Sequence, residues 1–287
     1  MNARHAAERL LQNALVAAPP RLLSIAGSDS GGGAGIQADL KAFARCGCHG
    51  MTAITAITAQ STTGVSAVHP LPPDAIVDQV RAVAEDIGVD AVKIGMLGST
   101  ATIEAVAGAL DLVGPVPVVL DPVMVAESGA RLLDADAHSA LATRLVPQAT
   151  VVTPNLSEAC ILAGADPPEG GQARPAEDVE ALAREVHELG PGAVVVTGGH
   201  LQDATDLFFD GRRVVRIPGE RHPDGATHGS GCTHSSALAA HLALGLDPLE
   251  SARRAKQIAS EAVRDGLRDL GAGAGPVDVF DLSHRRS

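Results

Sequence analysis

Short apolar runs rich in β-branched residues alternate with longer windows of helical periodicity along almost the whole chain after Pro20. Such alternation is typical of βα units, which build a largely parallel sheet covered by helices on both faces. The pattern therefore predicts an α/β fold. The expected strands are Arg21–Ala26, Met51–Thr58, Ala91–Ile94, Val116–Leu120, Thr150–Thr153 and Ala193–Thr197. The expected helices are Ala34–Arg45, Pro73–Ile87, Thr100–Leu112, Asp136–Leu145, Ser157–Ala163 and Ala176–Leu189.

The two ends of the chain depart from this alternation. Residues 1–20 are predicted to form an N-terminal extension, with a helical pattern that stops at Pro19-Pro20, ahead of one domain over 21–287. Asp210-Gly211 between two apolar runs predicts a hairpin, and two helices follow it. These elements are Ala204–Phe209, Arg213–Ile217, Cys232–Leu244 and Pro248–Leu270. Lys256, within the last helix, is a candidate for contact with a nucleotide, but a solvated face is the preferred expectation.

Composition excludes several classes of protein. The net charge of -12 and the absence of Trp and Tyr argue against a nucleic-acid partner, because phosphate backbones attract cations and bases stack on aromatic rings. No apolar stretch approaches the length of a membrane span. Four cysteines in 287 residues do not make a disulfide framework, so we expect reduced thiols in a cytoplasmic protein.

A glycine-dense turn follows the first expected strand and opens a helix, from Gly27 to Asp39. Gly33, Gly35 and Ala38 fit a dinucleotide-binding pattern, but the next strand lacks the acidic residue that would hold a ribose. A tight turn with positive φ explains the glycines and leaves Asp39 unexplained. The turn alone does not decide between these interpretations.

A second glycine-rich segment, Thr227 to Thr233, precedes an alanine-rich helix. Free backbone N–H groups and the positive end of the helix dipole would meet there, which predicts an anion site suited to phosphates. The alternative is an ordinary glycine-rich helix cap. No G-x-x-x-x-G-K-[ST] sequence occurs, so a P-loop is excluded as the phosphate cradle.

Six segments in this order resemble the hydroxymethylpyrimidine/phosphomethylpyrimidine kinases of the ribokinase-like superfamily. They are GSDSGGGAGIQADLKAF from Gly27, KIGML from Lys93, DPVMVAESG from Asp121, TPNLSEA from Thr153, GGH from Gly198 and HGSGCTHSSALAA from His228. The resemblance covers about residues 21 to 280 and implies a three-layer α/β/α kinase domain.

The resemblance also implies an activity. The expected reaction is ATP- and Mg²⁺-dependent phosphorylation of 4-amino-5-hydroxymethyl-2-methylpyrimidine and of its monophosphate, in thiamine biosynthesis. A homodimer is expected. A pyridoxal kinase on the same scaffold and a catalytically weak pyrimidine-binding regulatory protein are the alternatives.

Five residues match the positions at which this family holds its substrate. Asp39 and Gln60 are expected to bond the aminopyrimidine edge as acceptor and donor. Met96 is expected against the ring, and Gly27 and Val123 are expected to offer backbone contacts. Without the resemblance, filling of the core would be the better interpretation of Met96.

The metal site implied by the resemblance consists of Asn155, Glu158 and Asp121. Mg²⁺ prefers oxygen ligands and keeps several waters, so an amide and a carboxylate three residues apart on one helical face can hold a hydrated ion. A helix cap made by Asn155 or Ser157 explains the same residues equally well.

For ATP and its phosphates, the matching residues are Thr197, Gly199, Gly229, Ser230 and Gly231. Thr197 departs from the family, which often has lysine before Gly-Gly-His. A lysine would neutralise charge on the transferring phosphate, whereas threonine offers only a hydroxyl.

The catalytic group implied by the resemblance is Cys232, assisted by Gly229 and Gly231. Its position at a helix N-terminus predicts a depressed thiol pKa and a thiolate that serves as base. A zinc site made by His228, Cys232 and His234 is the alternative, and it lacks a fourth ligand.

Overall fold

The computed structural model describes residues 18–126, 129–134, 136–167, 175–198 and 204–284. Within them, nine strands form one sheet in the order β3-β2-β1-β4-β5-β6-β7-β8-β9. The strands from β2 to β7 in this order pair in parallel, whereas β3, β8 and β9 are antiparallel to their neighbours at the two edges. The strands are β1 (Arg21–Asp29), β2 (His49–Ser61), β3 (Gly64–Pro70), β4 (Ala91–Ile94), β5 (Val118–Leu120), β6 (Val151–Val152), β7 (Val194–Val196), β8 (Asp206–Phe209) and β9 (Val214–Ile217).

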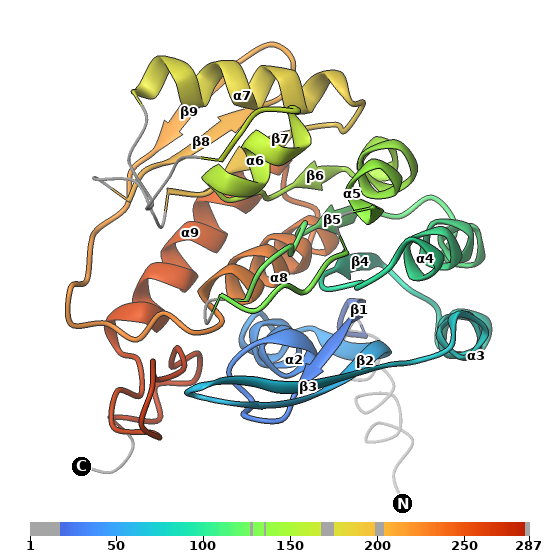
Figure 1. Cartoon of the computed structure of the whole chain (residues 1–287), viewed down its shortest axis with the longest axis horizontal. Helices are drawn as coiled ribbons and strands as arrows, with labels where there is room; N and C mark the ends of the chain where they lie inside the picture. The colour runs from blue at the N-terminus through green and yellow to red at the C-terminus, as the bar shows by residue number, and fades with distance from the viewer. Residues whose placement is uncertain (1–17, 127–128, 135, 168–174, 199–203, 285–287) are drawn as a thin grey trace, which may run out of the picture.

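Helices cover both faces of the sheet, which confirms the predicted three-layer α/β architecture (Figure 1). One face packs against α3 to α7, and the other packs against α2, α8 and α9. The helices are α2 (Gly35–Arg45), α3 (Pro73–Asp86), α4 (Thr100–Val113), α5 (Ala137–Ala140), α6 (Leu156–Leu162), α7 (Ala176–Glu188), α8 (Ser230–Ala243) and α9 (Pro248–Arg264).

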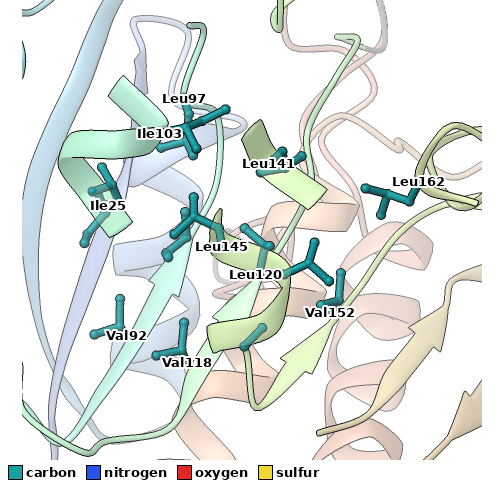
Figure 2. Close-up of a cluster of buried hydrophobic side chains, with 14 of the residues drawn as sticks. Ile25, Val92, Leu97, Ile103, Val118, Leu120, Leu141, Leu145, Val152 and Leu162 are labelled. Carbon is teal, nitrogen blue, oxygen red and sulfur yellow. The ribbon is translucent and has the colours of Figure 1, made fainter. Parts of the chain in front are cut away.

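The larger core lies between the sheet and the α3 to α7 layer. Figure 2 shows strand residues such as Val92, Leu120 and Val152 packed against Ile103 of α4 and Leu145, which follows α5. Side chains alternate between the two faces along a strand. Residues between these apolar positions therefore point toward α2 and α8, which is where buried polar groups gather.

The structure adds one strand to the sequence prediction and shortens the last helix. The strand β3 was not predicted, because most of its side chains are exposed and give little apolar signal. The last helix ends at Arg264 rather than Leu270. Gly266 follows at a close approach, since a Cβ there would lie 2.5 Å from the Cβ of Ala226. The chain then turns back, and the N–H of Leu267 donates to the carbonyl of Pro276.

The window predicted as one helix from Asp136 to Leu145 begins as α5 and continues as a π-helical turn over Leu141–Leu145. No helix of the described residues is long and apolar enough to cross a membrane. The N-terminal extension over residues 1–20 stays a prediction, because residues 1–17 lie outside the described ranges.

Candidate active site

Four polar residues and Met96 lie where the parallel strands end, at one edge of the sheet. Asp29 ends β1, Met96 follows β4, Asp121 follows β5, Asn155 follows β6 and Thr197 follows β7. In open α/β sheets, ligands bind in the crevice outside these carboxyl ends. The edge therefore defines the candidate site.

Asp29 joins the two glycine-rich segments that the sequence singled out. Its carboxylate accepts hydrogen bonds from the backbone N–H groups of Gly31, Gly33 and Ala34 and lies 2.9 Å from Nε2 of His228. Burial raises the pKa of Asp29, but the His228 contact and the backbone N–H groups outweigh it and hold the pKa below its ordinary value. The ionised side chain thus clamps the first turn to the start of the α8 segment.

The two glycine-rich segments touch through their backbones. Gly229 has φ of 86°, and a Cβ there would lie 1.7 Å from the carbonyl oxygen of Gly33. Only glycine fits this close approach in a left-handed conformation. Gly231, by contrast, has no atom within 4 Å of the place a Cβ would occupy and is exposed. The start of α8 is held from one side and open on the other, as an anion site requires.

Gly27 and Met96, two residues that the resemblance assigns to the substrate, lie close together. A Cβ on Gly27 would lie 3.0 Å from Cε of Met96, and the Met96 side chain is buried. Thr55 fixes this segment by donating to the carbonyl oxygen of Met96 at 2.7 Å. Val123 is half-buried, and its N–H is engaged with the carbonyl of Asp121.

Asp39 does not face the open site, which corrects the expectation of a direct acceptor for the pyrimidine. Its side chain is 0% exposed. Its oxygens accept from Ser24 at 2.5 Å, from Nζ of Lys93 at 2.9 Å and from Ser236 at 2.7 Å. Both carboxylate oxygens of Asp39 are thus bonded to donors of the protein itself.

Gln60 lies at the outer end of β2, apart from the Asp39 network. Its backbone exchanges hydrogen bonds with the hydroxyl of Ser30 in the first glycine-rich turn. Its side-chain oxygen accepts from Thr58 at 3.2 Å, so its amide NH₂ group is the part that can donate outward. Gln60 and Ser30 line an open pocket of about 480 Å³ beside the β2–β3 turn.

Cys232 occupies the first turn of α8, but the expected depression of its pKa is wrong. Desolvation by the surrounding protein raises the pKa of Cys232 to about 12, and the charges of Asp39 and Asp121 add to the rise. Lys93 and the backbone N–H of Gly35 act in the opposite direction and are outweighed. The positive end of the helix does not offset the loss of water, so the thiol is protonated near neutral pH.

The predicted magnesium ligands form two parts of one region. Asn155 and Glu158 make a capping box at the start of α6, because each side chain accepts from the other residue's N–H, at 3.0 and 2.9 Å. Burial raises the pKa of Glu158 to about 8, and the negative charge of Asp121 contributes. Asp121 is itself buried, accepts from Ser235 at 3.0 Å and has a raised pKa for the same reason.

Thr197 lies beside Asn155, because β7 ends in a parallel bridge between these two residues and the N–H of Thr197 donates to the carbonyl of Pro154. Gly199 lies outside the described residues.

Lys256 is not on a solvated face, which corrects the sequence expectation. Its Nζ is 2.6 Å from Oδ1 of the buried Asp206.

The zinc alternative is not supported by the arrangement of its proposed ligands. His228 contacts Asp29, and His234 contacts Asp206. Among the residues that the structure describes, no group of three or more His, Cys, Asp or Glu side chains could hold a metal ion.

Three consecutive residues of α8 reach three different buried carboxylates; sequence reasoning missed Ser235 and Ser236 and considered His234 only as a zinc ligand. His234 lies 3.3 Å from Asp206, Ser235 contacts Asp121 and Ser236 contacts Asp39. The signal was polar residues in an otherwise apolar helix. Lys93 carried a similar signal, since it lies within the short, fully buried strand β4.

Comparison with known proteins identifies relatives of the same family and the same fold. The model of the phosphomethylpyrimidine kinase family matches residues 29–278. A hydroxymethylpyrimidine/phosphomethylpyrimidine kinase of Rhizobium meliloti is 49% identical, with 90% of this chain and 96% of the relative covered. The structure of a phosphomethylpyrimidine kinase from Clostridium difficile has a TM-score of 0.74 at 40% identity and covers 85% of this chain and 99% of its own.

A related likeness extends to vitamin kinases with bound ligands. The pyridoxal kinase of Staphylococcus aureus, in complex with AMP-PCP and pyridoxal, has a TM-score of 0.81 at 34% identity and covers 91% of this chain and 94% of its own. Family and fold thus agree across sequence relatives and solved structures. The chain belongs to the phosphomethylpyrimidine kinase family, a group of phosphotransferases with the ribokinase-like fold.

Proposed function

We propose that the chain transfers the γ-phosphate of ATP to the hydroxymethyl oxygen of 4-amino-5-hydroxymethyl-2-methylpyrimidine, and then a second phosphate to the product. One observation carries the proposal: the open, glycine-rich start of α8 places Cys232 beside the wall of the first glycine-rich turn and above the Asp39–Lys93 pair. The proposed phosphate site, the proposed base Cys232 and the residues assigned to the pyrimidine are then neighbours at the carboxyl ends of the parallel strands.

The phosphates are assigned to the backbone at Gly229, Ser230 and Gly231, where the N–H of Ser230 also donates to the carbonyl of Thr227, and to Thr197. The role of Gly199 stays a prediction from the sequence. Backbone donors at a helix start hold an anion without side-chain rearrangement. The transition state of phosphoryl transfer is loose, so positioning and charge stabilisation contribute more than covalent chemistry.

The pyrimidine is assigned to the wall formed by Gly27 and Met96, with backbone contacts at Gly27 and Val123. Gln60 would donate its amide N–H to a ring nitrogen. Asp39 would act indirectly, by holding Lys93 in place beneath Cys232. This assignment replaces the direct bond from Asp39 that the sequence suggested.

Mg²⁺ fits the region of Asp121 and Glu158. Two buried carboxylates with raised pKa values repel each other, and a cation between them and the phosphates would relieve that repulsion. Mg²⁺ keeps waters and shares phosphate oxygens, so two carboxylates suffice. When bound, the ion would neutralise charge on the phosphates. Asn155 would act through its capping box with Glu158.

A proton and Mg²⁺ would compete for the Glu158 carboxylate, so the stabilisation of the fold by Mg²⁺ should depend on pH. Burial raises the pKa of Glu158 from its ordinary value of 4.5 to about 8 in the folded chain. Between these values the unfolded chain is ionised and the folded chain is protonated, so this group's contribution to stability is full below pH 4.5 and is lost as pH rises to 8. A cation favours the ionised form. Millimolar Mg²⁺ should therefore raise the melting temperature more at pH 8 than at pH 6.

Differential scanning fluorimetry of the wild type and of Glu158→Gln tests this expectation. The glutamine keeps an oxygen that can accept from the Asn155 N–H, so the helix cap is matched. The pH difference should disappear in Glu158→Gln. An equal Mg²⁺ effect at the two pH values in the wild type would contradict the assignment of Glu158.

Substrate choice gives a second prediction. The value of kcat/KM for hydroxymethylpyrimidine should exceed that for pyridoxal by at least about tenfold, because a site with fixed polar partners discriminates against ligands that leave them unpaired. Coupled ADP release with the two alcohols and with the pyrimidine monophosphate measures it. Gln60→Leu should reduce the preference. Equal or reversed efficiencies would favour pyridoxal, and binding without turnover would favour a regulatory protein.

The homodimer and the cytoplasmic location inferred from the sequence stay predictions.

A further inference from the structure

A buried cluster of charges lies away from the pyrimidine wall, where β7, β8, α8 and α9 meet. It consists of Asp206, His234 and Lys256, called here the Asp206 cluster. Their side chains are 1%, 5% and 14% exposed. The roles proposed above for the pyrimidine, the base and the metal use none of these three residues.

The contacts of Asp206 are divided between its two oxygens. Oδ1 accepts from Nζ of Lys256 at 2.6 Å and from the backbone N–H of Gly198 at 2.7 Å, whereas Oδ2 lies 3.3 Å from Nε2 of His234. Burial raises the pKa of Asp206, but His234, Lys256 and the Gly198 N–H together bring it below its ordinary value. A buried carboxylate thus bonds Lys256 of α9 and Gly198 after β7, and lies close to His234 of α8.

Gly198 connects the Asp206 cluster to the proposed phosphate site. It directly follows Thr197, assigned above to the phosphates, at the end of β7 and directly precedes Gly199. A Cβ on Gly198 would lie 2.0 Å from the carbonyl oxygen of Thr205, so the turn packs backbone to backbone on the start of β8. The Asp206 carboxylate is what orients the Gly198 peptide.

Two further observations favour a functional role over a purely structural one. Ala204, two residues before Asp206, has φ of 51°, a left-handed conformation that costs free energy in a residue other than glycine and is concentrated at ligand sites. His234 has no hydrogen-bond partner within normal geometry on either ring nitrogen and is nevertheless almost fully buried. An apolar residue in place of His234 would cost less.

We propose that the Asp206 cluster is a positioning device for the nucleotide: it sets the orientation of the Thr197–Gly198 turn relative to the start of α8, and so the affinity for the ATP phosphates. Thr197 brings no charge to this turn. Lys256 from α9 supplies a cation instead, through the Asp206 carboxylate that also accepts from the Gly198 N–H and lies 3.3 Å from His234. The inference rests on the proposed ATP-dependent function.

Lys256→Met removes the charge and keeps the length of the side chain. Loss of a charge-assisted contact should weaken binding of AMP-PCP about tenfold or more and raise KM for ATP by a similar factor. The KM for hydroxymethylpyrimidine should change less than about twofold, because its wall does not contact the cluster. Lys256→Arg should restore most of the nucleotide affinity. His234→Gln should act in the same direction as Lys256→Met.

Arg253→Met is the matched control, since Arg253 is an exposed cation on the same helix and pairs loosely with Glu250 at 3.8 Å. Calorimetry with AMP-PCP and steady-state kinetics with each substrate varied in turn give the result. If Lys256→Met and His234→Gln only lower the melting temperature, or raise both KM values equally, the cluster is structural and the proposal fails. If the wild type does not bind AMP-PCP, the proposed function itself fails.

Discussion

Replacing Lys93 with methionine is expected to lower the free energy of unfolding by about 3–5 kcal/mol, the cost of leaving a buried carboxylate without its partner. Lys93 and Asp39 are each 0% exposed and 2.9 Å apart. Asp39 keeps its hydrogen bonds from Ser24 and Ser236, but hydroxyl groups do not neutralise a charge. The remaining carboxylate must either stay charged in an apolar interior or take up a proton.

A double-mutant cycle distinguishes the charge pair from simple loss of packing. Asp39→Asn removes the charge and keeps the shape and hydrogen-bonding capacity, so Lys93→Met with Asp39→Asn should be more stable than the sum of the single effects predicts, by about 1–3 kcal/mol. Urea unfolding of the four proteins measures the coupling. Arg81→Met is the control, because Arg81 forms an exposed pair with Glu85 and should change stability by less than about 0.5 kcal/mol. Additive effects of the two core variants would refute the electrostatic account.

The sheet could be predicted because its parallel strands are buried on both faces. Such strands appear in the sequence as short apolar runs rich in β-branched residues. Ala91–Ile94 was predicted with its observed bounds. β3 could not be predicted in this way, since an exposed edge strand has no apolar face to reveal it. The overlong prediction for α9 has a different origin. The close approach of Gly266 to Ala226 depends on tertiary packing, and local helical periodicity carries no trace of it.

The candidate site was less predictable than the fold, and the failures share one physical cause. The sequence identifies Asp39 and Cys232 as chemically useful groups, but it does not tell which of them retains contact with water. Asp39 is surrounded by Ser24, Lys93 and Ser236, and the half-buried Cys232 lies near the charges of two acids. Burial and neighbouring charge decide both roles, and both depend on residues from other elements of the fold.

The raised pKa of Cys232 changes the expected pH dependence of the first phosphorylation. A thiol with a pKa near 12 is almost fully protonated at pH 7, so a mechanism that uses it as a base has to draw on a small thiolate fraction. That fraction rises roughly tenfold for each pH unit below the pKa. The first phosphorylation by the wild type should therefore accelerate from pH 7 to 9. The second should respond less, since its nucleophile is an already ionised phosphate.

Cys232→Ser keeps the size and offers a poorer base, so phosphorylation of the alcohol should fall by roughly a hundredfold or more, in line with the loss of general-base catalysis. Phosphorylation of the monophosphate should fall much less. Cys232→Asp should retain substantial activity in the first step with a flatter pH profile, because a carboxylate ionises at lower pH even beside Asp39 and Asp121. Coupled ADP release with each substrate separately gives the two rates. If Cys232→Ser slows both steps equally and the wild type shows no rise with pH, the thiol positions the phosphates or shapes the start of α8, and the base lies elsewhere.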